Sequence, residues 1–328
     1  MSTVDGHDHP RIYLAPLRGV TKRAYRTLFQ RHFGGVDLAV SPFILAWGRN
    51  LTERPLLGEI DPEREQAMPV VPQVIGGVPE HIVTICDTLA SMGYGEVNLN
   101  LGCPYRMVTK KRRGAGLLAL GDVVREMLDR VHERGRVRLS IKTRLGLDDP
   151  TQLESMAPML NAYPLKEVTI HPRVATQMYE GELDLDAFDR CRAALAAPVA
   201  YNGDIRTRAD YERLKTRFPS MTRWMIGRGL VADPFLARAI KGEDDAARDR
   251  LADVKRFVED LRLAYGEELS GPTHVLDRMK ELWTYLGDSF PGGVRFRKKV
   301  HRTHSMAKYV RMVEELFGEA QWLPGGGA

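Results

Sequence analysis

Residues 96–104 combine residue types and a spacing that could do chemistry. An apolar alternation predicts the end of a buried strand, in which Asn100 is one of the last residues. Gly102 then lets the backbone bend sharply, and Pro104 restrains Cys103 to extended or turn geometry. A thiol on a stiff turn at a strand end is well placed to meet a ligand, although a single cysteine is more often a small buried hydrophobe. Cys103 is therefore the first candidate for a catalytic residue.

Other polar residues follow other predicted strands, at the positions where a parallel barrel carries its chemistry. An isolated lysine or histidine at a strand end is usually only solvated, but several polar groups on one rim indicate a flat, polar, anionic ligand. Two glycine-bearing turns expose backbone N–H groups, which predict a phosphate site with Arg228 as a charge-assisted donor. The residues concerned are Pro16, Leu17, Arg18, Gln73, Asn100, Cys103, Lys142, Arg144, His171, Arg173, Asn202, Gly203, Asp204, Gly227 and Arg228.

Short apolar runs alternate with amphipathic stretches along most of the chain, and this alternation predicts a parallel sheet of β–α units. Strands are predicted at 12–15, 36–41, 70–75, 96–100, 138–142, 167–171, 199–201 and 224–226. Helices are predicted at 22–33, 80–92, 122–134, 151–162, 184–195, 207–218 and 233–239. Eight such units indicate an α/β protein with a (β/α)8 TIM barrel. The doubly wound alternative lacks its G-x-G-x-x-G fingerprint after the first strand.

The pattern changes after residue 242, where predicted helices follow one another without strands. These helices span 246–265, 273–286 and 294–317, and glycine and proline residues supply the breaks between them. We therefore expect a catalytic barrel domain over residues 1–242 and a small all-helical domain over residues 243–328.

The composition places limits on the partner and the compartment. Of the 328 residues, 43% are hydrophobic and 28% are charged, which is ordinary for a globular protein with a sizeable core. The net charge of +5 suggests a polyanionic partner. Three cysteines without framework spacing favour a reducing cytosol, and residues 1–10 are too polar for a signal peptide. We expect a cytoplasmic monomer with no membrane span and no metal site.

Five motifs occur in one order along the chain: LAPLRGVT at 14–21, NLNLGCP at 98–104, IKTRLG at 141–146, NGDI at 202–205 and IGRG at 226–229. Together they resemble the tRNA-dihydrouridine synthases, FMN-dependent enzymes built from a barrel and a helical domain. The resemblance covers roughly residues 12–310. It implies that NADPH reduces a tightly bound FMN, which then reduces the C5–C6 double bond of a uridine in tRNA.

The resemblance also implies roles for individual residues. Cys103 would be the proton donor, because a thiol with a pKa of about 8.5 stays mostly protonated at neutral pH. Asn100 would help to hold the uracil, and Lys142 would stabilise the anionic reduced flavin. The residues around the flavin would be Pro16, Leu17, Arg18, Gln73, Lys142, His171, Asn202, Gly203, Asp204, Gly227 and Arg228.

Two positions depart from the family pattern. The chain has His-Pro-Arg-Val at 171–174 where the family usually has His-Gly-Arg-Thr, so one hydroxyl is missing. Pro42 follows Ser41 where the family commonly has a glutamate.

Binding of tRNA requires a basic surface, and the helical domain offers one. Four basic residues at i, i+3, i+4 and i+7 would share one helical face, and residues 110–113 form a second basic patch after the cysteine loop. The target base must leave its stack, and an aromatic side chain can stack on it. The residues predicted to bind the substrate are Asn100, Arg173, Tyr179, Arg278, Lys280, Arg295, Lys298, Lys299 and Arg302.

Two alternatives stay open from the sequence alone. One is an FMN barrel oxidoreductase that acts on a small molecule or on another RNA, against which the basic helical region argues. The other is a non-catalytic RNA-binding relative, against which the retained Cys103, Lys142 and His171 argue.

Overall fold

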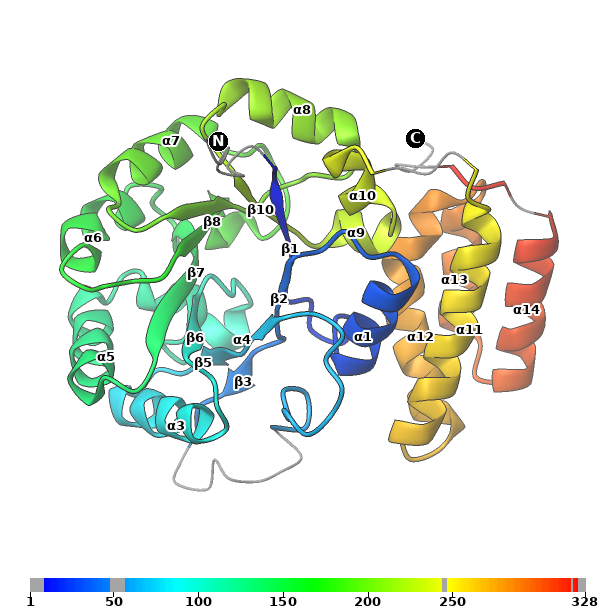
Figure 1. The fold of residues 1–328 in the computed structure, drawn as a ribbon, viewed down its shortest axis with the longest axis horizontal. Helices are drawn as coiled ribbons and strands as arrows, with labels where there is room; N and C mark the ends of the chain where they lie inside the picture. The colour runs from blue at the N-terminus through cyan, green and yellow to red at the C-terminus, as the bar shows by residue number, and fades with distance from the viewer. Residues whose placement is uncertain (1–8, 48–56, 244–246, 320, 324–328) are drawn as a thin grey trace, which may run out of the picture.

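The computed structural model describes residues 9–47, 57–243, 247–319 and 321–323. A ring of strands is surrounded by helices, and a bundle of further helices stands at one side of this ring (Figure 1). No helix within the described ranges is long and apolar enough to cross a membrane.

The strands form one sheet in which every pairing is parallel. The sheet order is β3-β5-β6-β7-β8-β9-β10-β1-β2-β4. Since β2 pairs with β4 and β3 pairs with β5, and β4 runs into β5, the sheet closes on itself as a barrel. The bounds are β1 Arg11–Leu14, β2 Leu38–Val40, β3 Ile44–Leu45, β4 Val70–Val71, β5 Gln73–Ile75, β6 Glu96–Leu101, β7 Arg138–Gly146, β8 Val168–Val174, β9 Val199–Tyr201 and β10 Arg223–Ile226.

The predicted TIM barrel is confirmed, with two changes in the strands. The predicted strand at 70–75 is split into β4 and β5 by Pro72, which has no N–H to donate to a ladder. The short strand β3 was not predicted, and it continues the barrel position of β2 beyond Pro42.

The predicted helices occur with shifts at their ends, and the short helices α4 Arg106–Thr109 and α9 Arg228–Ala232 were not predicted. One predicted helix is clearly different. A single helix was expected at 294–317, but Thr303 is extended and separates α13 from α14. The Ser305 hydroxyl then accepts a bond from Lys308 N, as an N-cap does. The bounds are α1 Arg23–His32, α3 Pro79–Ser91, α4 Arg106–Thr109, α5 Gly121–Arg134, α6 Gln152–Leu160, α7 Leu185–Ala194, α8 Arg208–Arg217, α9 Arg228–Ala232, α10 Leu236–Lys241, α11 Arg250–Glu268, α12 Pro272–Leu286, α13 Gly293–Arg302 and α14 Met306–Glu319.

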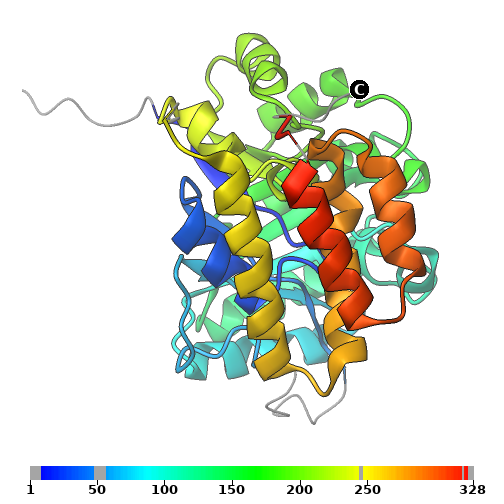
Figure 2. The same ribbon diagram turned by 90° about the vertical axis from the view of Figure 1, so that its right-hand side faces the viewer.

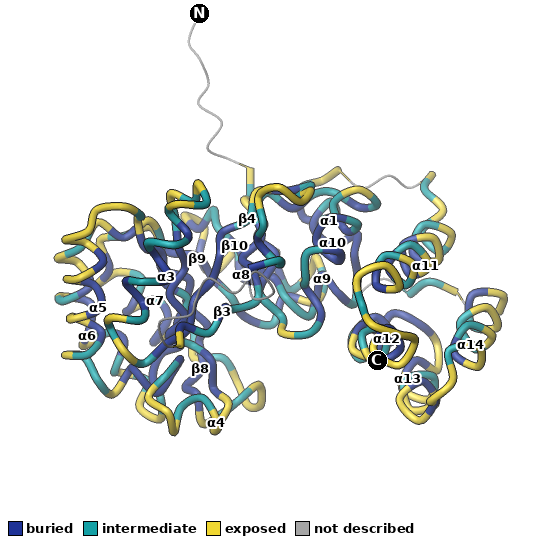
Figure 3. The backbone as a smooth tube through the Cα atoms, turned by 90° about the horizontal axis from the view of Figure 1, so that it is seen from below, coloured by how far each residue is buried: buried dark blue, intermediate teal, exposed yellow. Residues whose placement is uncertain are grey.

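The helical bundle α11–α14 stands beside the barrel (Figure 2). Phe257 of α11 meets Tyr25 of α1 and Phe33, the residue after α1, edge to face, with ring centroids 5.6 and 5.0 Å apart. All three rings are buried. Viewed from below, the buried backbone follows the strands and the facing sides of the helices, while α4 lies at an exposed edge (Figure 3). The predicted division after residue 242 falls in the connection between α10 and α11.

Candidate active site

A cavity of about 300 Å³ opens at the carboxyl ends of the barrel strands. It collects residues that lie far apart in the sequence, as the resemblance predicted. Arg173 and the predicted residues of the helical bundle do not line it. The predicted residues that do are Pro16, Leu17, Arg18, Gln73, Asn100, Cys103, Lys142, His171, Tyr179, Asn202, Gly203, Asp204, Gly227 and Arg228.

Asn100 builds the turn that carries the cysteine. Its Oδ1 accepts hydrogen bonds from the backbone N–H groups of Gly102 and Cys103, at 3.0 and 2.9 Å. Its Nδ2 donates to Oε1 of Gln73 at 2.8 Å. The side chain therefore fixes the orientation of the cysteine loop before any ligand arrives.

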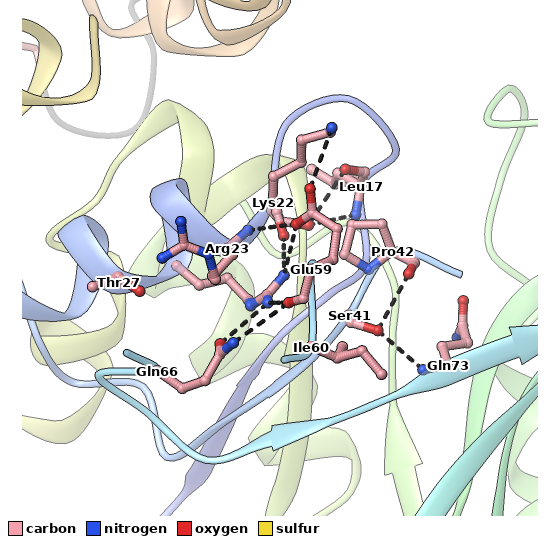
Figure 4. A network of polar contacts seen from close by, with 12 residues as sticks. Leu17, Lys22, Arg23, Thr27, Ser41, Pro42, Glu59, Ile60, Gln66 and Gln73 are labelled. Atoms are coloured by element: carbon pink, nitrogen blue, oxygen red, sulfur yellow. Dashed lines mark hydrogen bonds and ion pairs between the residues drawn. The ribbon is translucent and has the colours of Figure 1, made fainter. Parts of the chain in front are cut away.

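The hydrogen bonds continue from Gln73 across the floor of the cavity. Gln73 Nε2 donates to Asn98 Oδ1 at 2.8 Å, and Asn98 Nδ2 donates to Ser140 Oγ at 3.0 Å. The backbone N–H of Gln73 donates to Ser41 Oγ at 3.1 Å (Figure 4). All of these side chains are buried, so each amide is held in one orientation by its partners.

Figure 4 also shows how the first barrel loop is anchored. Leu17 N donates to Oγ1 of Thr21 at 2.8 Å, which closes the turn that brings Pro16 and Leu17 to the cavity. The buried guanidinium of Arg26 donates to the carbonyl of Thr21 at 2.9 Å and holds this turn from behind.

Cys103 presents a protonated thiol to the cavity. The side chain is 8% exposed, and burial raises its pKa above the usual value. A hydrogen bond from Tyr105 N–H and the charges of Arg144 and Lys142 oppose this rise without cancelling it. Gly114 packs so closely here that a Cβ at its position would lie 2.8 Å from the Cβ of Cys103. The thiol is thus fixed in place and in its acid form.

Lys142 and Arg144 project from β7 beside the cysteine loop. Burial and the nearby charge of Arg144 lower the pKa of Lys142 to about 7. Arg144 is 2% exposed and donates to the carbonyls of Gly102 and Val174, at 3.2 and 2.9 Å. Arg144 therefore ties the cysteine loop to the end of β8. The sequence placed Arg144 at a strand end but gave no sign of this role, because its partners are backbone carbonyls.

His171 is a neutral imidazole of defined tautomer. Its Nδ1 lies 2.6 Å from the carbonyl oxygen of Asn202, so Nδ1 carries the proton and donates. Its Nε2 accepts from Arg173 at 3.4 Å. Burial and then the charges of Arg144, Lys142 and Arg173 hold the pKa of His171 well below its usual value. Since it carries no charge, His171 adds no positive charge that would lower the pKa of the Cys103 thiol.

Asp204 binds two arginines at the turn that follows β9. Arg173 donates to it at 2.6 Å and also to the carbonyl of Gly181 at 2.7 Å, while Arg228 donates to it at 2.5 Å. Burial acts to raise the pKa of Asp204, but Arg173 and Arg228 outweigh it and hold the pKa below its usual range. Arg173 is 3% exposed, so it reaches the cavity only through Asp204 and His171.

Tyr179 forms one side of the mouth and is held between two cations. Its ring centroid lies 5.1 Å from the guanidinium carbon of Arg144 and 4.9 Å from that of Arg228. The edge of His171 meets the same ring at 6.2 Å. The backbone of Met178 has a φ of 53°, which turns Tyr179 back toward the cavity.

The helical bundle contributes a wall that the sequence did not indicate. Tyr285 of α12 lines the cavity, and Arg278 of the same helix lies against the Gly19 turn. Lys280 forms an ion pair with Asp277 at 3.5 Å. On α13, the predicted basic residues Arg295, Lys298, Lys299 and Arg302 all reach the surface of the bundle.

The lining suits an anionic, partly flat group. Apolar side chains from the β1 and β2 loops face glycine turns at β9 and β10. The cationic side chains outnumber the carboxylates, which favours an anion. The cations are Arg18, Lys142, Arg144, Arg206 and Arg228, and the only carboxylate among the described residues that line the cavity is Asp204.

Comparison with known proteins finds a family model and relatives that all carry the name dihydrouridine synthase. A family model described as dihydrouridine synthase matches residues 13–321. The chain is 28% identical over 324 residues to the tRNA-dihydrouridine(16) synthase of Cupriavidus necator, covering 94% of this chain and 98% of that protein. It is 30% identical over 317 residues to the protein of the same name from Ralstonia nicotianae, with 93% and 95% covered. It is 27% identical over 323 residues to tRNA-dihydrouridine synthase B of Pseudomonas aeruginosa, with 95% and 94% covered.

Two solved structures share the fold at low sequence identity. A morphinone reductase variant in complex with tetrahydroNAD aligns with a TM-score of 0.52 at 12% identity, covering 71% of this chain and 87% of that one. A 2-naphthoyl-CoA reductase with its naphthoyl-CoA aligns with a TM-score of 0.53 at 12% identity, covering 71% and 50%.

Proposed function

Because the chain belongs to the dihydrouridine synthase family, we propose that it reduces the C5–C6 double bond of a specific uridine in tRNA, with FMN as cofactor and NADPH as reductant. The family membership expected from the motifs is confirmed. The observation that carries the proposal is the buried, protonated thiol of Cys103, fixed by Asn100 at the edge of a cationic cavity.

The residues around the cavity suit FMN. Arg228 and the glycine turns at 203 and 227 would hold its phosphate, and Lys142 would lie beside the ring system. When bound, the flavin supplies a hydride to C6 of the uracil. The anionic ring of the reduced flavin would raise the pKa of Lys142 from about 7, so the lysine would be a cation beside the reduced cofactor.

Cys103 would supply the proton that C5 of the uracil needs. General acid catalysis requires a group that is protonated at working pH and within reach of the acceptor atom. Burial keeps this thiol protonated, and the hydrogen bonds from Asn100 set the position of the loop that carries it. The remaining N–H of Asn100 Nδ2 could donate to the base.

Several other residues would bind the RNA. Tyr179 would stack on the extruded base at the mouth, since base–aromatic stacking contributes about 1–3 kcal/mol per base. The surface cations of α13 would contact phosphates, with Arg278 and Lys280 closer to the barrel. We propose action in the cytoplasm, which three free cysteines support.

Mapping of dihydrouridine in tRNA tests the proposal. We expect one uridine to lose the modification in cells that lack this protein and to regain it when the gene is restored. The purified protein should carry FMN and form dihydrouridine on an unmodified tRNA transcript when NADPH is added. Product on a free nucleobase, with none on tRNA, would favour the small-molecule oxidoreductase. A protein that takes up no FMN would favour a non-catalytic RNA-binding relative.

A further inference from the structure

A large aromatic side chain stands exposed directly after the cysteine turn. Tyr105 follows Pro104, lines the cavity and is 49% exposed. Its neighbour Met107 on α4 is 68% exposed. Exposed apolar side chains of this size next to a cavity mark a surface that binds something.

A second aromatic side chain approaches the same mouth from the helical bundle. Tyr285 of α12 lines the cavity and is half-buried. Burial raises its pKa, and the phenols of Tyr105 and Tyr179 add to this rise, so the three rings are electrostatic neighbours. Tyr105 comes from the β6 loop and Tyr285 from α12, so the two rings enclose the mouth from different parts of the chain.

The surroundings of Tyr105 favour a polyanion over an apolar partner. Arg106, Lys110 and Lys111 are exposed on the segment that begins at Tyr105. Aromatic rings that alternate with cations are the combination that binds single-stranded nucleic acid, because bases stack on the rings while the cations contact phosphates. Tyr179, which contacts Arg144 and Arg228, is the ring assigned above to the target base itself, so Tyr105 and Tyr285 are the mouth rings left for further bases.

We propose that Tyr105 and Tyr285, the mouth tyrosines, stack on the unpaired bases that flank the target uridine. The inference rests on the proposed function and extends it, because it assigns the bases beside the target uridine to two named rings. The helical bundle then takes part in base recognition at the mouth as well as in phosphate contact. Tyr285 is a positioning residue, since it touches the RNA beside the reacting base.

The test combines protein variants with altered RNA. The target uridine is first mapped, and tRNA is then assembled with an abasic ribose at either flanking position. Purified FMN-loaded protein is assayed as wild type and as the Tyr105→Leu, Tyr105→Phe, Tyr285→Leu and Tyr285→Phe variants. Each leucine variant should raise the apparent KM for tRNA about 5- to 100-fold, and phenylalanine should restore it, because stacking needs the ring.

The abasic RNA shows whether a base is the partner. When wild-type protein is assayed, the abasic tRNA should raise the apparent KM by a factor similar to that of a leucine variant. When the leucine variant of the ring that stacks on the missing base is assayed, the abasic tRNA should raise the KM little further. The slope of log K against log salt should stay unchanged in the tyrosine variants, because every cation that meets a phosphate is still present. The Lys110→Ala, Lys111→Ala pair should instead flatten it by roughly 0.7–0.9 for each phosphate that is no longer neutralised. Flavin content and the rate of reduction by NADPH are measured for every variant, so that a change in the KM for tRNA is separated from a change at the flavin site.

The outcomes separate this inference from the proposed function. If wild type forms no dihydrouridine on any tRNA, the proposed function fails and the inference fails with it. If wild type forms dihydrouridine but the leucine variants behave as wild type, the mouth tyrosines do not bind RNA. Effects of variant and abasic site that add independently would also overturn the stacking. If Tyr285→Leu does not fold, Tyr105 is exposed enough to carry the test alone.

Discussion

The barrel mouth and helix α13 are the two regions that we propose to contact the tRNA, yet they are built in opposite ways. At the mouth, Asn100, Gln73 and Arg144 are buried and each is held by partners with defined donors and acceptors. On α13 the cations, among them Lys298 and Arg302, lie at the surface and face solvent.

This difference separates two kinds of contribution. A buried network fixes geometry, and removal of one member leaves its partners unsatisfied at a cost of about 1–3 kcal/mol. An exposed cation acts through its charge, which is screened by salt and has little effect on stability. Chemistry should therefore depend on the mouth, while affinity for tRNA and its salt dependence should depend on α13.

The largest expected effect comes from the mouth, with Cys103→Ala. Removal of the general acid should slow dihydrouridine formation by about 10²- to 10⁴-fold. Reduction of the flavin by NADPH, followed by bleaching of its absorbance, should remain. Wild-type product rates would rule out Cys103 as the acid. Loss of bound FMN together with both half-reactions would instead indicate a structural cysteine.

The next effect concerns the floor of the cavity. Asn98→Leu removes both hydrogen bonds that Asn98 makes, and it leaves Gln73 and Ser140 without these partners. The free energy of unfolding should fall by about 1–3 kcal/mol, and FMN affinity should weaken because Gln73 loses its fixed orientation. Urea denaturation and flavin titration measure the two effects. Stability equal to wild type would show that the buried network is not what fixes the mouth.

The contrasting test on α13 should leave stability unchanged, within about 0.5 kcal/mol. The combined Lys298→Ala, Lys299→Ala, Arg302→Ala variant should raise the apparent KM for tRNA. Its salt slope should flatten by roughly 0.7–0.9 for each phosphate that a removed cation had neutralised. Flavin content and reduction by NADPH serve as controls, since the helix lies outside the cavity. If affinity and slope match wild type, the tRNA footprint must be sought around residues 110–113.

The smallest expected effect is the uptake of less than one proton by Lys142. Because its pKa is about 7 without ligand, the lysine is mostly neutral at pH 8, and binding of reduced FMN, whose ring is anionic, should recharge it. The affinity for reduced FMN should therefore fall as the pH rises above 7. Anaerobic calorimetry at pH 8 in two buffers of different ionisation enthalpy should detect proton uptake below one per reduced FMN bound. Lys142→Met should abolish the uptake and weaken FMN binding, and equal uptake in this variant would exclude the lysine.

The parts of the molecule that follow from local pattern could be predicted from the sequence. The β–α alternation and the glycine turns led to the barrel and to the residues around the cavity. Tyr285 and Arg144 could not be assigned in this way. Tyr285 meets the mouth only because α12 packs beside α9, and Arg144 acts through distant backbone carbonyls.

The break between α13 and α14 also could not be predicted from the sequence, although it involves only neighbouring residues. Residues 303–305 are Thr, His and Ser, with no glycine or proline to mark a break, so the sequence predicted one helix where the chain turns. Thr303 follows the last residue of α13 and is only 3% exposed, so the turn at this residue is enclosed by other parts of the folded bundle. A periodic pattern reports which face is buried, but not whether the axis bends.

The aromatic contacts between α11 and the α1 region determine how the molecule unfolds. Phe257, Tyr25 and Phe33 bury large apolar areas against one another across the barrel and the bundle. A fragment that ends before α11 would expose the rings of α1 to water and invite aggregation. We expect the barrel and bundle to melt in one cooperative transition, so that the protein cannot lose helices α11–α14 and persist as a free-standing barrel.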